Sequence, residues 1–291
     1  MLTGSFVALV TPFEKNTLEI DEAKLRELIS WQIESGTEGI VVVGTTGESA
    51  TLSHAEHHRV IEIAIDEVKK RVPLIAGAGS NNTSEAVDLA EHAKRAGADY
   101  ILSIGPYYNK PTQDGFIAHY SKIAEVGAPT LIYNVPGRTG KNIEAETILA
   151  LAKIPNIAGI KEASGNLDQI KKICEEKPDD FVVLSGEDSQ TLEIIKAGGA
   201  GAIGVVQNEI PAEMKAMIHS ALNGEWEQAQ AVQKKFARLM ELNFADNNPI
   251  DVKWALHKMG KLDYAVRLPL TEPSEENKEK IAAELQTLGL A

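Results

Sequence analysis

Short apolar segments alternate with longer amphipathic segments along most of the chain. Runs rich in β-branched residues predict strands, and runs with apolar residues three or four positions apart predict helices. Strands are expected at 5–10, 39–44, 73–77, 99–104, 129–134, 157–162, 181–186 and 200–205. Helices are expected near 21–35, 53–70, 83–96, 113–126, 144–153, 166–176 and 188–197. Several of these helices should end at glycines that can adopt a left-handed cap, namely Gly36, Gly97, Gly127 and Gly198–Gly199.

Eight strands that alternate with helices imply parallel pairing and right-handed crossovers. An open doubly wound sheet and a closed barrel both fit this alternation. The number eight favours the barrel, and so does the absence of a GxGxxG turn after the first strand. The predicted fold class is therefore α/β, a (β/α)8 TIM barrel with a C-terminal helical appendage.

The pattern changes after the eighth strand and becomes helical only, from about residue 209 to residue 291. That length exceeds the single helix that a barrel needs to close. We predict a barrel over residues 1–208 and a C-terminal helical region over 209–291, which begins with the last barrel helix. No low-complexity linker separates the two, so the appendage should pack against the barrel.

Composition narrows the possible partners. The chain has 291 residues, 43% of them hydrophobic, and a formal net charge of −13. An acidic chain has no long-range attraction for nucleic acid or anionic lipid, so neither is an expected partner. An anionic substrate would need local positive charge. The single cysteine, Cys174, excludes an internal disulfide, and the absence of a signal-like start or membrane-length apolar run predicts a cytoplasmic protein.

Lys161 is the most informative residue, because it lies at the end of the predicted strand 157–162. Catalytic residues of barrels lie where the carboxyl ends of strands meet the following loops. Alternation along the strand puts Ile157 and Gly159 on the same face as Lys161. If that face points inward, burial lowers the pKa of the amine, which can then form a Schiff base with a ketone. Position alone favours a solvated lysine instead.

Four other segments fall at predicted strand ends: 44–49, 105–111, 133–140 and 184–188. The first, GTTGES, could bind a carboxylate through hydroxyl and backbone N–H groups, or be a turn in which a Thr cap is completed by Glu48. Tyr107, Tyr108 and Tyr133 could relay protons or simply pack. Arg138 could bind a carboxylate or lie on the surface.

Metal binding is not expected. His54, His57 and His58 have helical spacing, but no HExxH-type carboxylate pattern accompanies them. Cys174 lies in the middle of a predicted helix rather than at a strand end, so a role as nucleophile is disfavoured as well.

Taken together, GTTGES, PYYN, YNVPGRTG and GIKEASGN closely resemble the dihydrodipicolinate synthase family, which belongs to the same aldolase superfamily as N-acetylneuraminate lyase. The similarity runs from about residue 3 to about residue 271. It implies that Lys161 is the Schiff-base lysine. It assigns a proton relay to Tyr133, Thr45 and Tyr108, the last lent by a neighbouring subunit. It assigns substrate binding to Thr46, Arg138, Gly186 and Ile203, with Thr46 on the pyruvate carboxylate and Arg138 on that of aspartate semialdehyde.

The implied chemistry is a condensation of pyruvate with L-aspartate 4-semialdehyde, a step of diaminopimelate and lysine biosynthesis. Lys161 forms an imine with pyruvate, the methyl group loses a proton, and the resulting enamine attacks the aldehyde. Ring closure by the substrate's amine releases the lysine, so no cofactor beyond the covalent Schiff base is implied. Family members that L-lysine inhibits bind it with residues resembling Ser49, Ala50, His54, His57, Asn81, Glu85 and Tyr107. The resemblance also implies a homotetramer, a dimer of dimers.

Two rival functions stay open. A different lyase of the superfamily, for N-acetylneuraminate or a 2-keto-3-deoxy-sugar acid, would share the lysine and the tyrosine, although Arg138 with the paired threonines favours the synthase. A catalytically silent ligand-binding barrel is the second rival. One position departs from the family, because Asp251 replaces the second proline of an NPxPxK motif and puts the local helix geometry in question.

Overall fold

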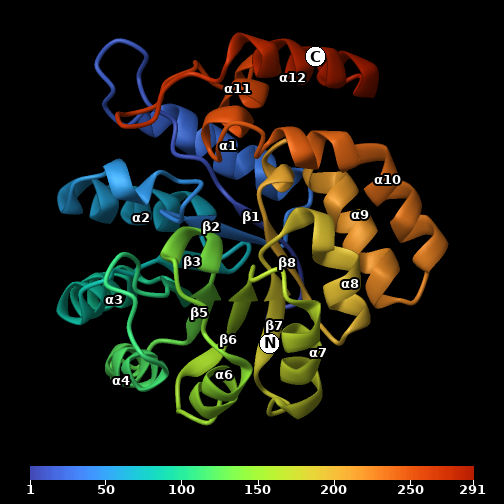
Figure 1. Ribbon diagram of the computed structural model, residues 1–291. Helices are drawn as coiled ribbons and strands as arrows, with labels where there is room; N and C mark the ends of the chain where they lie inside the picture. The colour runs from blue at the N-terminus through green and yellow to red at the C-terminus, as the bar shows by residue number, and fades with distance from the viewer.

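The computed structural model describes residues 1–291 and shows the predicted alternation of strands and helices (Figure 1). The strands are β1 (Gly4–Ala8), β2 (Gly39–Val42), β3 (Leu74–Gly77), β4 (Tyr100–Ile104), β5 (Thr130–Asn134), β6 (Ile157–Glu162), β7 (Val182–Ser185) and β8 (Gly201–Gly204). The helices up to the eighth strand are α1 (Glu22–Glu34), α2 (His54–Val68), α3 (Thr83–Ala96), α4 (Gln113–Ala124), α5 (Pro136–Thr139), α6 (Ala145–Leu151), α7 (Leu167–Glu176) and α8 (Thr191–Lys196). Short 3-10 turns occur at η1 (Ser49–Thr51), η2 (Asp188–Gln190) and η3 (Val206–Asn208).

The eight strands form one closed parallel barrel in sequence order. Pairing of β1 with β8 closes it, with Phe6 opposite Ile203. The prediction of a TIM barrel is therefore confirmed. Because the strands are parallel, all their carboxyl ends lie at one rim, which gathers residues that are far apart in the sequence.

Side chains alternate between the barrel interior and the layer beneath the helices. The interior cluster contains Phe6, Val41, Leu102, Leu131, Tyr133, Leu184 and Ile203. The outer cluster is larger and joins the other faces of the strands to the apolar stripes of the helices, with Val7, Ile40, Ile132 and Ile160 among its members. Burial on both faces explains why the strand segments are almost continuously apolar.

The expected face of Ile157 is wrong. Ile157 packs in the outer cluster, whereas Gly159 faces Val182 and Leu131 of the interior. The cause is a register shift between β5 and β6, where Thr130 pairs with Ile157 but the next residue, Leu131, pairs with Gly159. The extra residue breaks the alternation, so only the part of β6 after the shift keeps the face of Lys161.

Helix ends agree with the capping signals. Gly97 is the C-cap of α3 with φ of 109°, and Gly36, Gly127 and Gly198 also have positive φ. The N-terminus of α2 differs from the expected Thr cap completed by Glu48. Ser53 caps the helix and Glu56 completes the capping box, while Glu48 is a left-handed residue before η1.

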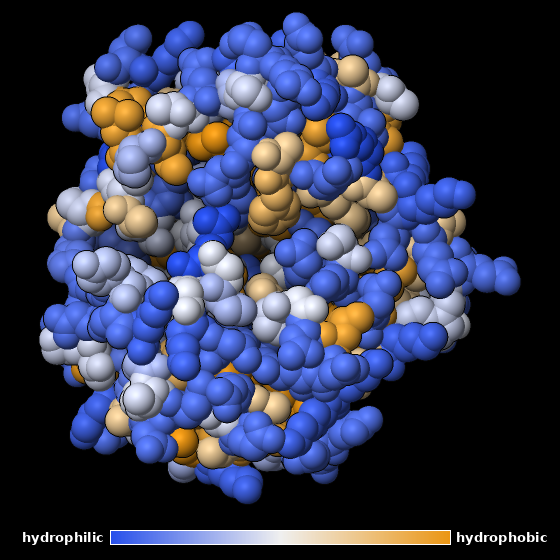
Figure 2. Space-filling view, viewed as in Figure 1, coloured by the Kyte–Doolittle hydropathy of each residue, from blue (hydrophilic) through white to orange (hydrophobic).

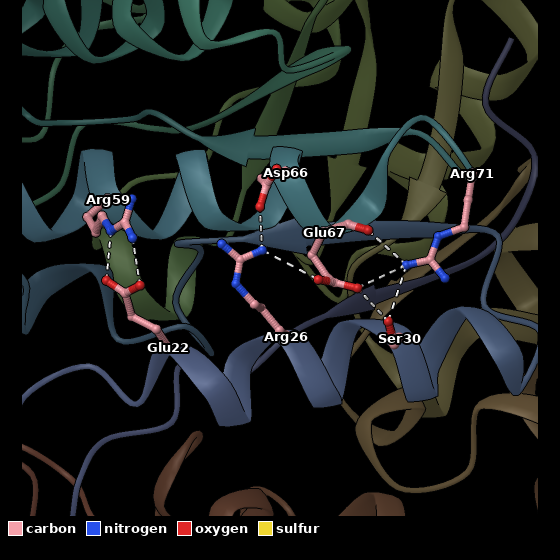
Figure 3. A network of polar contacts seen from close by, with 7 residues as sticks. All are labelled: Glu22, Arg26, Ser30, Arg59, Asp66, Glu67 and Arg71. Carbon is pink, nitrogen blue, oxygen red and sulfur yellow. Dashed lines mark hydrogen bonds and ion pairs between the residues drawn. The ribbon is translucent and has the colours of Figure 1, made fainter.

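A network of surface ion pairs joins α1 to α2 on the outside of the barrel (Figure 3). Arg59 binds Glu22 with two parallel hydrogen bonds of 2.7 and 2.6 Å, and Arg26 contacts Asp66 at 2.6 Å. Solvent screens such pairs, so we assign the network only a modest role in holding the helices together.

The C-terminal region consists of α9 (Pro211–Leu222), α10 (Trp226–Leu242), α11 (Ile250–Lys258) and α12 (Glu275–Leu288). In Figure 1, α10 lies outside α9, and α11 and α12 lie together at the top of the view. A second apolar cluster, which includes Met214, Phe236, Leu239 and Ile281, joins these helices to the barrel. The appendage therefore packs on the barrel as expected, and the boundary at residue 208 stays a prediction.

Asp251 does not disturb α11. Its carboxylate accepts hydrogen bonds from the backbone N–H groups of Asp246 and Asn247 at 2.9 and 3.0 Å, and from the Asn277 amide at 2.7 Å. The side chain thus satisfies backbone donors in the segment before the helix, which a proline side chain could not do because it has no acceptor. None of the helices has both the length and the apolar character needed to cross a bilayer.

Candidate active site

Lys161 lies inside the barrel at the carboxyl-terminal part of β6. The residue is 5% exposed, and its amine lies 4.4 Å from the centre of the Tyr133 ring. Tyr133 is its register partner on β5, so strand pairing sets this contact. Because Lys161 is buried, the alternative of a solvated lysine at this position is wrong.

Gly186 provides the space that Lys161 occupies. A Cβ atom at Gly186 would lie 2.9 Å from the Lys161 Cε atom and 3.0 Å from its Cγ atom. Both distances are shorter than normal carbon contacts, so a side chain here would push the lysine out of place. Ile203 is fully buried in the interior cluster on β8, below the rim.

A cavity of about 370 Å³ opens at this rim. One part of its wall carries the side chains of Thr45, Tyr133 and Arg138. Another part carries six of the seven residues of the predicted lysine site: Ser49, Ala50, His54, His57, Glu85 and Tyr107. Three residues of the predicted catalytic and substrate-binding group and six of the predicted lysine site therefore border one continuous space. Figure 2 shows the face seen in Figure 1 hollowed near its centre and surrounded largely by hydrophilic residues.

Asn248 connects two of the predicted substrate-binding residues. Its amide donates a 3.0 Å hydrogen bond to the hydroxyl oxygen of Thr46, which is 2% exposed. Its backbone carbonyl accepts a 3.3 Å hydrogen bond from Arg138. Arg138 lies on the short helix α5 rather than in an irregular loop, and the rest of its guanidinium stays available for another acceptor.

Six predicted residues are not part of the cavity wall in the single chain: Lys161, Thr46, Gly186, Ile203, Tyr108 and Asn81. Tyr108 is 90% exposed and has a φ of 69°, which is uncommon for a residue with a side chain. Asn81 is not part of the cavity wall, although its carbonyl accepts a 2.8 Å hydrogen bond from Asn109.

The histidines of α2 face different surroundings. His54 contacts Glu85 at 2.7 Å, and a hydrogen bond from Ser80 holds the pKa of Glu85 below its usual value, with His54 acting in the same direction. Burial lowers the pKa of His57 to about 4, so its ring is neutral near pH 7. His58 instead stacks on His92 of α3 with ring centres 3.6 Å apart. No group of three or more His, Cys, Asp or Glu side chains is arranged to hold a metal ion.

Cys174 is partly buried on α7, and burial raises the pKa of its thiol to about 11. A thiol that stays protonated near pH 7 is a poor nucleophile. Its position and its pKa both agree with the interpretation that Cys174 does not act in catalysis.

Two buried carboxyl groups near Lys161 were not predicted. Glu162, the next residue, points to the outer layer and accepts hydrogen bonds from the Asn134 amide and from the backbone N–H of Ser164. Asp188 follows β7 and accepts hydrogen bonds from the backbone N–H groups of Val205 and Val206, at the start of η3. Burial raises the pKa of its carboxyl group to about 6. No local sequence pattern marks either carboxyl group as buried, since a carboxylate after a strand end is usually solvated.

The closed barrel and the buried lysine at its rim place the chain among TIM-barrel enzymes whose site lies at the carboxyl ends of the strands. The sequence profile described as the dihydrodipicolinate synthetase family matches residues 1–288. The chain belongs to this family, so the resemblance noted from its motifs is confirmed.

Similar proteins match this chain over 99% or more of its length. The 4-hydroxy-tetrahydrodipicolinate synthase of Syntrophus aciditrophicus (strain SB) is 51% identical over 291 residues, which is 100% of this chain and 99% of the relative. The chloride-inhibited dihydrodipicolinate synthase of Acinetobacter baumannii, crystallised with pyruvate, has a TM-score of 0.97 and 43% identity, with 100% of both chains covered. The synthase of Cyanidioschyzon merolae with lysine bound has a TM-score of 0.97 and 37% identity, with 99% of both chains covered.

Proposed function

We propose that the chain is a 4-hydroxy-tetrahydrodipicolinate synthase, which condenses pyruvate with L-aspartate 4-semialdehyde in diaminopimelate and lysine biosynthesis. The observation that carries the proposal is the buried amine of Lys161 against Tyr133, beside a cavity that also contains Thr45 and Arg138. The identity of 51% to a synthase over the full chain supports the same activity.

In the proposed reaction the Lys161 amine attacks the ketone carbon of pyruvate, and loss of water gives an imine. The protonated imine withdraws electrons, so the methyl group loses a proton and an enamine forms. The enamine carbon attacks the aldehyde of the second substrate. Attack of that substrate's own amine on the imine carbon closes the ring and expels Lys161, which regenerates the free enzyme. The protonated imine formed on Lys161 is the electron sink, so this route needs no cofactor.

Thr46 and Arg138 are assigned to the two carboxylates. The Thr46 hydroxyl accepts from Asn248, so its own proton can be donated to the pyruvate carboxylate. Arg138 donates one N–H to the backbone carbonyl of Asn248. Its remaining donors can bind the carboxylate of aspartate semialdehyde. Gly186 and Ile203 would line the pyruvate side of this site, where Gly186 leaves room for the lysine.

Proton transfer is assigned to Tyr133 and Thr45, whose side chains border the same cavity, together with Tyr108. Tyr108 is too exposed to act within its own subunit, so we assign it to the site of a neighbouring copy. This role needs at least a dimer, and the proposed assembly is a homotetramer, a dimer of dimers.

L-Lysine is proposed as a feedback inhibitor that binds in the cavity which Arg138 also borders. Glu85 would pair with an amino group of the inhibitor, while His54, His57 and Tyr107 border the same space. Ser49, Ala50 and Asn81 complete the proposed site. The synthase of Cyanidioschyzon merolae, crystallised with lysine, supports this proposal by likeness.

Steady-state kinetics test the proposed reaction against its nearest rival. Pyruvate with aspartate semialdehyde should give turnover at least about 1000-fold above that with N-acetylmannosamine, because a site built for one set of polar groups rejects substrates that leave them unpaired. Turnover only with the sugar substrate would show the lyase, and no turnover with either would show a silent barrel.

A further inference from the structure

Glu48 has an unusual place two positions after Thr46, the predicted carboxylate-binding threonine. Its φ is 54° and it is 2% exposed, so a charged residue in a left-handed conformation is turned into the protein. Such a backbone conformation is strained for a residue with a side chain and persists where the surroundings hold it. Hydrogen bonds from the Glu48 N–H to Thr45 and from the Ser49 N–H to Gly44 tie this residue to the tip of the loop.

The partner of Glu48 comes from the C-terminal appendage. Lys253 of α11 is fully buried and forms an ion pair with Oε1 of Glu48. Its amine also donates a 2.8 Å hydrogen bond to the carbonyl of Ala265 and lies 4.2 Å from the centre of the Phe13 ring. The other Glu48 oxygen accepts a 3.2 Å hydrogen bond from the backbone N–H of Arg267. Both oxygens of the carboxylate are thus bound by residues more than 200 positions away in the sequence.

A contribution to stability does not by itself account for this ion pair. Removing two charges from water costs several kcal/mol per ion, and an apolar pair of similar volume often serves stability equally well. Burial accordingly lowers the pKa of Lys253 to about 8, although Glu48 opposes that change. A buried ion pair does supply one property that apolar packing lacks, since it fixes the relative position of its two partners with defined geometry.

The same C-terminal segment touches the loop a second time. Asn248, five positions before Lys253, donates to the Thr46 hydroxyl at 3.0 Å. Contacts at Thr46 and at Glu48 flank the buried Gly47, so α11 and the residues before it hold the loop on both sides of this glycine. The direction of the Thr46 hydroxyl proton therefore depends on where this segment lies.

We propose that Glu48 and Lys253 are positioning residues, which fix the Thr45–Thr46 turn so that Thr46 can hold the carboxylate of the 2-keto acid. The C-terminal appendage is then part of the active site rather than an accessory to the barrel. This inference rests on the proposed function, because it assumes that Thr46 binds pyruvate.

The test uses Lys253→Met and the double variant Glu48→Gln/Lys253→Met in the full chain, with Lys278→Met as the matched control. Lys278 is another largely buried lysine whose ion pairs, to Glu272 and Glu275, lie outside the site. Each protein is titrated with pyruvate and reduced with borohydride. The fraction of chains that carry the reduced pyruvate adduct, a carboxyethyl group on the amine, is then measured by mass spectrometry. The double variant leaves no unpaired buried charge, so it is designed to fold even if the single variant does not.

We expect the pyruvate concentration for half-maximal trapping to rise about tenfold or more in the double variant, while the maximal trapped fraction stays near one per chain. Lys278→Met should trap like the wild type. A folded double variant with the wild-type half-saturation would overturn the positioning role and leave the ion pair purely structural. Failure of the wild type itself to trap pyruvate would be a different result, because it would remove the proposed function first.

Discussion

Lys161 and Tyr133 are register partners on adjacent parallel strands, and the lysine amine lies 4.4 Å from the centre of the tyrosine ring. Both side chains point into the barrel, so the pairing of β5 with β6 sets their separation without help from a loop. A phenol is thereby held against the amine at which the proposed chemistry begins, and the barrel scaffold supplies this geometry.

Tyr133→Phe keeps the ring beside Lys161 and removes only the hydroxyl. Because general acid–base groups typically contribute a factor of about 100 or more, kcat should fall by roughly that factor. The imine with pyruvate should still be trappable, since Lys161 remains. Tyr100→Phe, at the amino end of the neighbouring strand β4 and so away from the site, is the matched control. A Tyr133→Phe enzyme with the wild-type kcat would refute the assignment of proton transfer to this phenol.

Arg138→Met removes the guanidinium at the cavity wall. A charge-assisted hydrogen bond contributes about 1.5–3 kcal/mol, so KM for aspartate semialdehyde should rise about 10- to 100-fold. The concentration of pyruvate that half-saturates borohydride trapping should change much less. Measuring both constants separates the substrates, and a rise confined to pyruvate would place Arg138 on the wrong carboxylate.

Glu85→Gln tests the proposed lysine site. The Ser80 hydrogen bond keeps the pKa of Glu85 low, so the wild-type carboxylate is charged at pH 7 and can pair with an amino group. We expect the concentration of L-lysine for half-maximal inhibition to rise about tenfold or more in the variant. Glu91→Gln, on the exposed surface of α3, serves as the control. Wild-type activity that is unaffected by millimolar lysine would eliminate the inhibitor site.

His119 predicts a pH dependence of stability. It is 4% exposed on α4, contacts the Thr83 hydroxyl at 3.0 Å, and burial lowers its pKa to about 4. The folded state therefore binds fewer protons than the unfolded state between about pH 4 and pH 6.5, so the free energy of unfolding rises with pH across this window. His119→Gln cannot titrate and should flatten this rise by roughly 3 kcal/mol at most. Urea unfolding at several pH values measures it, and identical slopes in both proteins would contradict the assignment.

The fold could be predicted from the sequence because the signals are local. Each strand is a short apolar run, and glycines such as Gly97 and Gly127 mark where helices end. Lys161, Thr45 and Arg138 could be selected because parallel strands bring their carboxyl ends to one rim. The face of Ile157 could not be predicted, since it depends on a register shift between two strands rather than on β6 alone.

The contacts that the C-terminal appendage makes could not be predicted from local sequence patterns. Glu48 fits a capping pattern in sequence, yet its partner Lys253 lies 205 positions away. Asn248 and Lys253 belong to the NPxPxK-type segment, whose only departure from the family pattern is Asp251. Their role depends on how α11 packs against the GTTGES turn, and that packing is a tertiary property which no periodicity encodes.

Borohydride reduction in the presence of pyruvate tests the central claim most directly. If Lys161 is the Schiff-base amine, the reduced adduct should be found by mass spectrometry on the peptide that contains Lys161, at close to one per chain. Lys161→Arg should show no adduct and lose activity by at least about 1000-fold, because an arginine cannot act as the nucleophilic amine. An adduct on another lysine, or none in a wild-type protein that is folded and saturated with pyruvate, would contradict the account.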